Sequence, residues 1–290
     1  MKLLAKFNLI FILVMALGVA VSGWISHGLL QAQAREEVVG TGRLMMEKAL
    51  AVRGYTTNHI AKLLQTQMQY EFLPQSVPSF AATEVLSTLQ KSYPQFGYKE
   101  ATLNPTNPRD RAVDWEVDIV NSFRTNAELK ELVGVRDTPT GASLYVARPL
   151  RITNPACLQC HSSVEAAPRT MVEKYGPANG FGWQLNEVVG AQVVSVPMDL
   201  PLQRANENFK LFISSLVGVF VVVGIVLNLM IWFVVVRPVT ELSALADRVS
   251  QGDLDAPEFA AGGKDEIAVL AQSFSRMRAS VVQAMKMLDN

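Results

Sequence analysis

The side chains most suited to chemistry are concentrated in one short stretch, CLQCH. Cys157 and Cys160 are the only cysteines of the chain, and His161 is one of its three histidines. Two thiols separated by two residues and followed by a histidine form the attachment pattern of a c-type haem. The thiols would form thioether bonds with the porphyrin vinyl groups, and the imidazole would become an axial iron ligand. The pattern predicts one covalent haem c held by these three residues.

Two other roles are open to a CxxC pair. A disulfide between Cys157 and Cys160 is compatible with an oxidising compartment. A zinc site needs four ligands, and no second cysteine pair or nearby histidine supplies them. A chance match is the third alternative. Covalent haem is favoured because a membrane span would deliver this segment to the outside, where haem attachment occurs.

The second axial position of the iron has three candidate ligands. They are His59, Met45 and Met46, because histidine and methionine are the usual partners of a c-type haem. A seven-residue spacing links Val38, Met45, Val52 and His59, which places His59 and Met45 on one helix face. An open or water-filled position is the alternative, and it would suit a gas or redox sensor.

Haem also needs partners for its propionates and its apolar ring. Three arginines are candidates for the propionates, although each could equally be a solvated side chain: Arg148, Arg151 and Arg169. Four aromatic residues are expected in the core, and some of them would line the porphyrin: Tyr145, Tyr175, Phe181 and Trp183.

Two uncharged apolar runs, 7–25 and 211–236, explain much of the 49% hydrophobic content. Each is long enough to cross about 30 Å of hydrocarbon as a helix. Lys2, Lys6 and the small-residue stretch 32–34 would also suit a cleaved signal peptide. The first run is longer than a usual signal core and ends well before 32–34, so a retained anchor is favoured.

Charge and span positions predict the organisation and location of the chain. Lys2, Lys6 and Arg237 favour cytoplasmic ends in a bacterial inner membrane, with a periplasmic domain between the spans. The predicted parts are a cytoplasmic N-terminus 1–6, spans 7–29 and 210–236, a periplasmic domain 30–209 and a tail 237–290. Lys plus Arg and Asp plus Glu each total 26, so no basic surface suggests nucleic acid.

The periplasmic domain is predicted to be α+β. A long helix is expected over 31–69, and shorter helices over 81–93 and 114–126. The Asn-Pro steps in 103–112 disfavour helix. Apolar or alternating segments over 142–152 and 188–198 are expected to be strands, which predicts a small antiparallel sheet.

The tail 237–290 shows two apolar heptad patterns joined by a polar connector from Gly252 to about Lys264. The first contains Leu242, Leu245 and Val249, and the second contains Ile267, Leu270, Phe274, Met277, Val281 and Leu288. Such helices need a partner copy to cover their apolar faces. With Pro238, Gly252 and Asp265-Glu266, the tail resembles a HAMP linker domain. An unrelated juxtamembrane coiled coil is the alternative.

The region 35–200 resembles the c-haem-binding PAS-like sensor domain of bacterial signalling proteins. The resemblance rests on FGY at 96–98, NPTNPRD at 104–110, DWE at 114–116, ARP at 147–149, CLQCH, Tyr175-Gly176 and Val189-Gly190-Ala191. It implies a PAS-like antiparallel sheet with haem on Cys157, Cys160 and His161. Some relatives use a cysteine of the N-terminal helix as second iron ligand, and this chain has no third cysteine.

These features together predict a membrane-bound haem sensor. We expect a homodimer, through HAMP and the first helix, that relays a periplasmic redox or small-ligand signal to a cytoplasmic partner resembling a kinase or chemoreceptor. No kinase, cyclase or methyl-accepting helix follows in the printed chain, so we expect no enzymatic output here. A membrane-anchored cytochrome for periplasmic electron transfer is the alternative, and a haem enzyme ranks last.

Overall fold

The computed structural model describes residues 3–139, 141–253, 257 and 265–288. Lys2 and most of the predicted connector, including Lys264, lie outside the described residues. The chain divides into two compact units. One comprises Met1–Ser26 and Phe209–Asn290, and the other His27–Asn208. Each unit is described by itself below.

The second unit begins within α1 (Leu3–Tyr55), which starts in the first unit. The helix continues as a π-helical turn η1 (Thr56–Ile60) and a short α2 (Ala61–Leu63). The long helix predicted over 31–69 is therefore confirmed to Leu63. Its end is wrong, because Gln67–Gln69 form a separate 3₁₀ turn.

The two shorter helices predicted from the sequence are confirmed. They are α3 (Pro78–Ser92) and α4 (Asp114–Thr125). Pro78 opens α3, where its missing N–H costs no intrahelical bond. Glu116 accepts a hydrogen bond from the backbone of Val113 at 2.9 Å, which satisfies a free donor at the start of α4.

A four-stranded antiparallel sheet in the order β1-β4-β3-β2 forms the centre of this unit. Its strands are β1 (Gly97–Thr102), β2 (Leu132–Thr138), β3 (Gly141–Arg151) and β4 (Val188–Pro197). The sequence predicted the two central strands, β3 and β4, and missed the edge strands. β1 reads GYKEAT, and its charged residues are poor strand formers. Edge strands therefore carried the weaker sequence signal.

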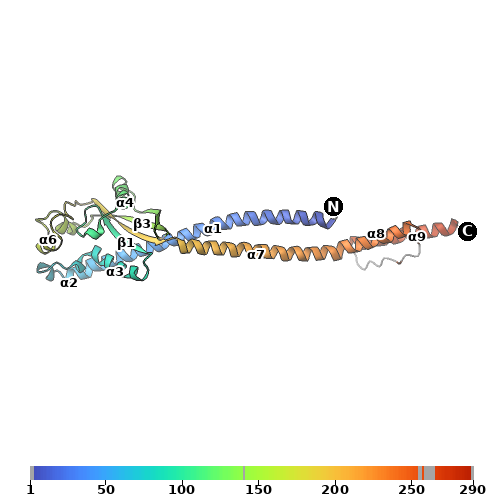
Figure 1. Ribbon diagram of the computed structural model, residues 1–290, viewed down its shortest axis with the longest axis horizontal. Coiled ribbons are helices and arrows are strands. Elements are labelled where there is room, and N and C mark those ends of the chain that lie inside the picture. The colour runs from blue at the N-terminus through green and yellow to red at the C-terminus, as the bar shows by residue number, and fades with distance from the viewer. Residues whose placement is uncertain (1–2, 140, 254–256, 258–264, 289–290) are drawn as a thin grey trace. The chain divides into compact units, whose positions relative to one another are not determined.

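Helices lie on both faces of the sheet (Figure 1), and its side chains alternate between the two faces. On one face α1 packs in a cluster that we call the core cluster: Val38, Met45, Met46, Leu144, Val146, Val194, Val196 and Met198. On the other face α4 packs through Ile119, Val120 and Phe123 against Ala147 and Val193. The predicted α+β fold with an antiparallel sheet is confirmed.

The seven-residue pattern of α1 predicts its buried face only as far as η1. Val38 and Met45 are buried at 2% and 6% exposure and Val52 is half-buried, but His59 is exposed. A π-helical turn contains more residues than an α-helical turn, so it shifts the phase of the residues that follow. The expectation that His59 and Met45 share one face is therefore wrong.

Two helices are long and apolar enough to cross a membrane, and their uncharged apolar runs, 7–25 and 211–236, belong to the first unit. They lie within Leu4–Leu63 and Asp199–Ser250, with mean hydropathies of 2.4 and 2.9 in their most apolar windows. The second corresponds to α7 (Asp199–Ile231), a π-helical turn η6 (Trp232–Val236) and α8 (Arg237–Ser250). Within these helices Asn8 and Asn228 exchange side-chain hydrogen bonds of 2.9 and 2.8 Å.

The tail helices are α8 and α9 (Glu266–Leu288), in the two predicted positions. Leu242, Ala268 and Ala271 are buried in the single chain. Three of the predicted heptad residues are instead largely exposed: Leu270, Met277 and Val281. The side chain of Leu288 lies outside the described residues. The single chain therefore leaves part of the predicted apolar pattern uncovered.

Candidate haem-attachment site

The CLQCH segment forms a compact helical turn directly after a cap. Asn154 Oδ1 accepts a hydrogen bond of 2.9 Å from the backbone N–H of Ala156, which starts the 3₁₀ turn η5 (Pro155–Cys157). The short helix α5 (Leu158–His161) continues from it. Residues three apart in helical backbone lie on the same side. Cys157 and Cys160 are thereby presented together, directly beside His161.

The two thiols are free and half-buried. Burial raises the pKa of Cys157, and the nearby Arg53 guanidinium opposes that rise. Burial also raises the pKa of Cys160, and Cys157 adds to the rise. Among the residues that the structure describes, no group of three or more His, Cys, Asp or Glu could hold a metal ion. A zinc site built around these thiols therefore has no support in the described ranges.

The His161 ring is held by two contacts that leave one nitrogen free. Its Nδ1 lies 2.7 Å from the carbonyl oxygen of Gly180. A carbonyl only accepts hydrogen bonds, so Nδ1 carries the proton and Nε2 keeps its lone pair in the neutral ring. The ring also stacks on Trp183, with centroids 4.0 Å apart and an interplanar angle of 14°.

Burial lowers the pKa of His161, and the hydrogen bond to Gly180 opposes this change. The lowered pKa favours the neutral imidazole, which is the form that binds a metal. A neutral ring with a free Nε2 and an anchored Nδ1 is the usual arrangement of a metal-ligating histidine. Two free thiols on one turn beside such a ring therefore fit the donor set of a c-type haem.

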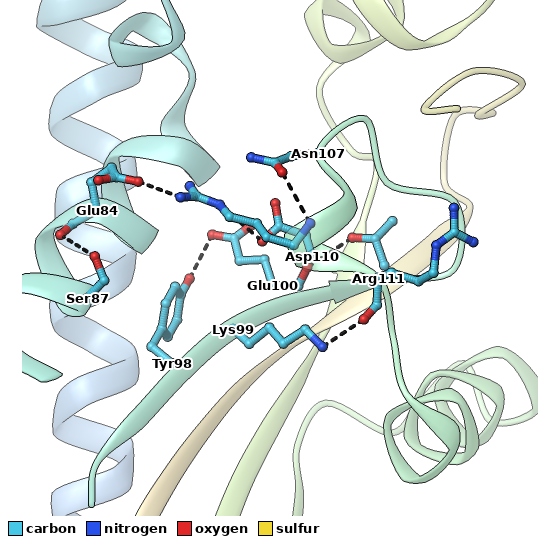
Figure 2. A network of polar contacts seen from close by, with 10 residues as sticks. Glu84, Ser87, Tyr98, Lys99, Glu100, Asn107, Asp110 and Arg111 are labelled. Carbon is cyan, nitrogen blue, oxygen red and sulfur yellow. Dashed lines mark hydrogen bonds and ion pairs between the residues drawn. The ribbon is translucent and has the colours of Figure 1, made fainter. Parts of the chain in front are cut away.

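Arg53, whose charge acts on Cys157, belongs to a buried polar network around Glu100. Figure 2 shows the part of this network that contains Tyr98, Glu100 and Asp110. Arg53 on α1 pairs with the carboxylate of Glu100 on β1, whose side chain is only 3% exposed. The Tyr98 hydroxyl donates to Glu100 at 2.7 Å and accepts from Gln192 at 3.1 Å. Burial alone would lower the pKa of Arg53, but the Glu100 carboxylate raises it overall. Burial and Glu100 both raise the pKa of Tyr98.

A second acid, Asp110, lies near Glu100 in the same network (Figure 2). Burial is the largest reason that the pKa of Asp110 rises to about 6. Glu100 adds to this rise, while Arg109 opposes it. Arg109 is itself bound to Glu84 on α3 at 2.5 Å. The network thus contains the carboxyl groups of Glu84, Glu100 and Asp110 and two guanidinium groups, of which that of Arg53 acts on Cys157.

The segment that follows α2 packs on the helix α6 (Arg169–Tyr175) that follows CLQCH. Thr170 donates to the carbonyl of Met68 at 3.4 Å, and Lys174 donates to that of Phe72 at 3.4 Å. The rings of Phe72 and Tyr175 meet edge to face, with centroids 5.8 Å apart. Of the aromatic residues predicted to be core or ring-lining, Tyr175 therefore packs on Phe72, and Trp183 stacks on His161.

The structure places the three candidates for the second axial position in two environments. Met45 and Met46 belong to the core cluster and are 6% and 0% exposed. His59 is exposed in η1, with its ring 5.1 Å from that of Tyr55. Helical rise places Met46 about 10 Å along α1 from Arg53. The charge of Arg53 acts on the pKa of Cys157. The ligand assignment stays a prediction.

The three arginines considered for the propionates have other partners. Arg148 pairs with Glu47 at 2.6 Å and with Glu131 at 3.1 Å. Arg151 donates to the carbonyl of Asn186 at 3.0 Å. Arg169 is 91% exposed and pairs with Glu173 on its own helix. None of these contacts leads to CLQCH.

The sequence did not indicate two residues that act on the CLQCH side chains, Arg53 and Gly180. The Arg53 charge acts on the Cys157 thiol, and the Gly180 carbonyl accepts a hydrogen bond from His161. Arg53 is a single charge on a long helix, and nothing in its neighbourhood along the chain sets it apart. Gly180 follows Pro177, Ala178 and Asn179 in a stretch that only indicates a loop. Both relations depend on tertiary packing.

The comparisons with known proteins agree with both predicted resemblances. Residues 31–197 match the Tll0287-like family (Tll0287), and residues 234–283 match the HAMP domain. The chain is also similar to the crystal structure of the cyanobacterial heme-protein Tll0287, with 16% identity and a TM-score of 0.44. That alignment covers 56% of this chain and 95% of the other. No curated protein matches the chain.

The family match takes in more than half of the 290 residues. The HAMP match begins within η6 and includes α8 and most of α9. The chain therefore belongs to the Tll0287-like family and carries a HAMP domain after its Tll0287-like domain.

Proposed function

We propose that this protein is a membrane-bound c-type haem sensor. Cys157 and Cys160 would hold the haem through thioether bonds, and His161 Nε2 would ligate the iron. The observation that carries the proposal is the pair of free thiols on one turn beside a neutral imidazole anchored through Nδ1. Tll0287, the namesake of the family, is a heme-protein. When bound, the haem would supply a one-electron redox centre and a potential site for small ligands.

The second axial position is proposed to be open or to be filled by His59, Met45 or Met46. His59 is the first to test, because its side chain is exposed. Met45 and Met46 pack in the core cluster, so ligation by either would remove a buried side chain from that cluster. His59→Ala would convert a six-coordinate low-spin spectrum to a high-spin one if His59 is the ligand.

The proposed location is a bacterial inner membrane, with the haem domain in the periplasm and both ends in the cytoplasm. Three observations support it: the two apolar helices, the HAMP domain and the placement of Lys6 and Arg237 at span ends. Haem attachment outside the membrane requires the same orientation for CLQCH.

The proposed output is a rearrangement of the HAMP helices in a homodimer through HAMP and the first helix. A second copy would cover the exposed heptad residues Leu270, Met277 and Val281. Iron oxidation or ligand binding would bias two arrangements of these helices, which a cytoplasmic partner would read. A membrane-anchored cytochrome would need the haem but would have no use for HAMP.

The proposal is tested on the full chain, produced with c-haem maturation and purified in detergent. Absorption spectra are recorded oxidised and reduced, with and without carbon monoxide or nitric oxide. A spin label at Met277→Cys then reports distances between α9 helices in each iron state. We expect these distances to change with oxidation or with gas binding. Unchanged distances in all iron states would contradict the relay.

A further inference from the structure

The carbonyl that anchors His161 belongs to a loop with unusual backbone. Gly176, Gly180 and Gly182 have φ values of +81°, +87° and +82°, a region that favours glycine. Two backbone hydrogen bonds tie the end of this loop to CLQCH, from Gly182 to the carbonyl of Ser162 and from Trp183 to that of His161. The position of the Gly180 carbonyl therefore depends on what holds residues 176–182 in place.

Asn104 holds this loop with both ends of its side-chain amide. Its Oδ1 accepts from the backbone N–H of Gly180 at 3.3 Å, and its Nδ2 donates to the carbonyl of Phe181 at 3.3 Å. These two groups belong to the peptides on either side of the Gly180–Phe181 peptide. That central peptide carries the carbonyl that meets His161 Nδ1. One amide thus fixes the orientation of the His161 partner from both sides.

The central sheet in turn fixes Asn104. Strand β1 ends at Thr102, paired with Gly190 of β4, and Leu103 donates to the carbonyl of Val189 at 3.2 Å. Asn104 follows immediately. Two successive hydrogen-bonding contacts therefore connect the end of a paired strand to the imidazole. Asn104 contacts Gly180, and Gly180 contacts His161.

A close approach of the two loops strengthens this connection. A Cβ on Gly180 would lie 2.0 Å from Thr106 Oγ1 and 2.9 Å from Thr106 Cα, so only glycine fits. Arg111 also donates to Asn179 Oδ1 at 3.2 Å. The segment 104–111, which includes the NPTNPRD stretch, thus contacts the anchoring loop at several points.

We propose that Asn104 is a positioning residue that sets the hydrogen bond at His161 Nδ1 and thereby the redox potential of the iron. The inference rests on the proposed function, in which His161 is an axial ligand. A hydrogen bond from Nδ1–H to a carbonyl makes the imidazole a stronger donor to the metal. A stronger donor favours ferric over ferrous iron, so the clamp by Asn104 keeps the midpoint potential low.

The test is a redox titration of the full-length, haem-loaded protein with Asn104→Ala. Loss of such supporting hydrogen bonds changes metal-site properties about tenfold or more. We expect the oxidised-to-reduced ratio at fixed potential to fall about tenfold, which is an upward midpoint shift of about 59 mV for one electron.

The matched control is Asn107→Ala, which also removes an asparagine amide without adding charge. Asn107 Oδ1 caps its own turn by accepting from the Arg109 N–H at 3.2 Å, a contact outside the 176–182 loop. Its midpoint should equal that of the wild type. Asn104→Ser, whose hydroxyl is too short to reach Phe181, is the second variant if the alanine variant does not accumulate. It should show the same upward shift.

The outcomes separate the inference from the proposed function. Haem-loaded Asn104→Ala with a wild-type midpoint, or with a lower one, would overturn the inference and leave the haem proposal standing. A change in thermal stability without a change in midpoint would show a structural role only, which also overturns it. A wild-type chain without covalent haem would end both.

Discussion

The two ends of the sensor-domain part of α1 differ in what surrounds them. Between Val38 and Ala49 the buried face of the helix packs on the sheet and α3 through apolar side chains, several of them fully buried. The α1 residues that form ion pairs in this stretch, Arg43 and Glu47, are exposed. About one turn later Arg53 enters a buried network of charges and acts on Cys157, and the helix then changes to a π-helical turn. π-Helical turns occur often at functional sites.

This difference in surroundings distinguishes the part of the domain that provides stability from the part that provides chemistry. Burial of apolar side chains is the main favourable term in folding. A buried ion pair contributes little net stability, because desolvation offsets its attraction. We infer that the core cluster provides most of the stability of the domain, and that the charged network acts on the proposed haem site through Arg53. The predictions below test this contrast.

The largest loss of stability is expected in the core cluster, from Met46→Ala. Met46 is fully buried, and truncation of such a side chain costs about 2–5 kcal/mol. Thermal or denaturant unfolding of the full chain in detergent measures the loss. Leu44→Ala is the control, since Leu44 is 57% exposed and should cost less than about 0.5 kcal/mol. A loss below about 1 kcal/mol for Met46→Ala would contradict the central role of this cluster.

An intermediate loss is expected from Arg53→Met in the charged network. The substitution keeps the apolar stem and leaves the Glu100 carboxylate buried without its partner. Breaking such a pair costs about 3–5 kcal/mol when fully buried, and about 2–3 kcal/mol here because Arg53 is 25% exposed.

The control for Arg53 is Arg43→Met on the same helix. Arg43 pairs with Glu131, but its side chain is 56% exposed, so removal should cost about 0–1 kcal/mol. Equal losses for the two variants would mean that burial of the Arg53 pair has no energetic consequence. Only Arg53→Met is expected to alter the haem spectrum as well.

The smallest change in the free energy of unfolding, a gain instead of a loss, is expected from Asp110→Asn. The folded-state pKa of about 6 lies above the ordinary 3.8, so the folded protein holds this proton more tightly than the unfolded chain. The stability contributed by the proton is full below about pH 4 and is lost as the pH rises through 6. The uncharged asparagine should therefore stabilise the domain by about 1–3 kcal/mol at pH 7 and by nothing at pH 4.

Melting curves at both pH values check this sign. Asp118→Asn on the exposed side of α4 is the control, and it should change the free energy of unfolding by less than about 0.5 kcal/mol. A destabilised Asp110→Asn at pH 7 would show that the Asp110 carboxylate supports the fold, and the contrast between the two regions would then fail.

The sequence predicted the parts of the molecule whose signals are local. Single segments of the sequence were enough to predict the apolar runs, the helical period of α1, the strands β3 and β4 and the CLQCH motif. β1 was missed because Glu100 is tolerated in a strand only through Arg53, which lies 47 positions away. The exposure of His59 was not predicted because no simple pattern of residue types marks a π-helical turn. Asn104 stood out only as part of a family stretch, and its contact with Gly180 spans 76 positions.

The most direct test of the account is the intact mass of the full chain under denaturing conditions, after production with c-haem maturation. The account predicts one haem covalently bound per chain, and no haem on the double variant Cys157→Ser with Cys160→Ser. The His161→Ala variant should keep a covalent haem, with an altered spectrum. A wild-type chain that releases its haem on denaturation, or that never carries one, would contradict the central claim.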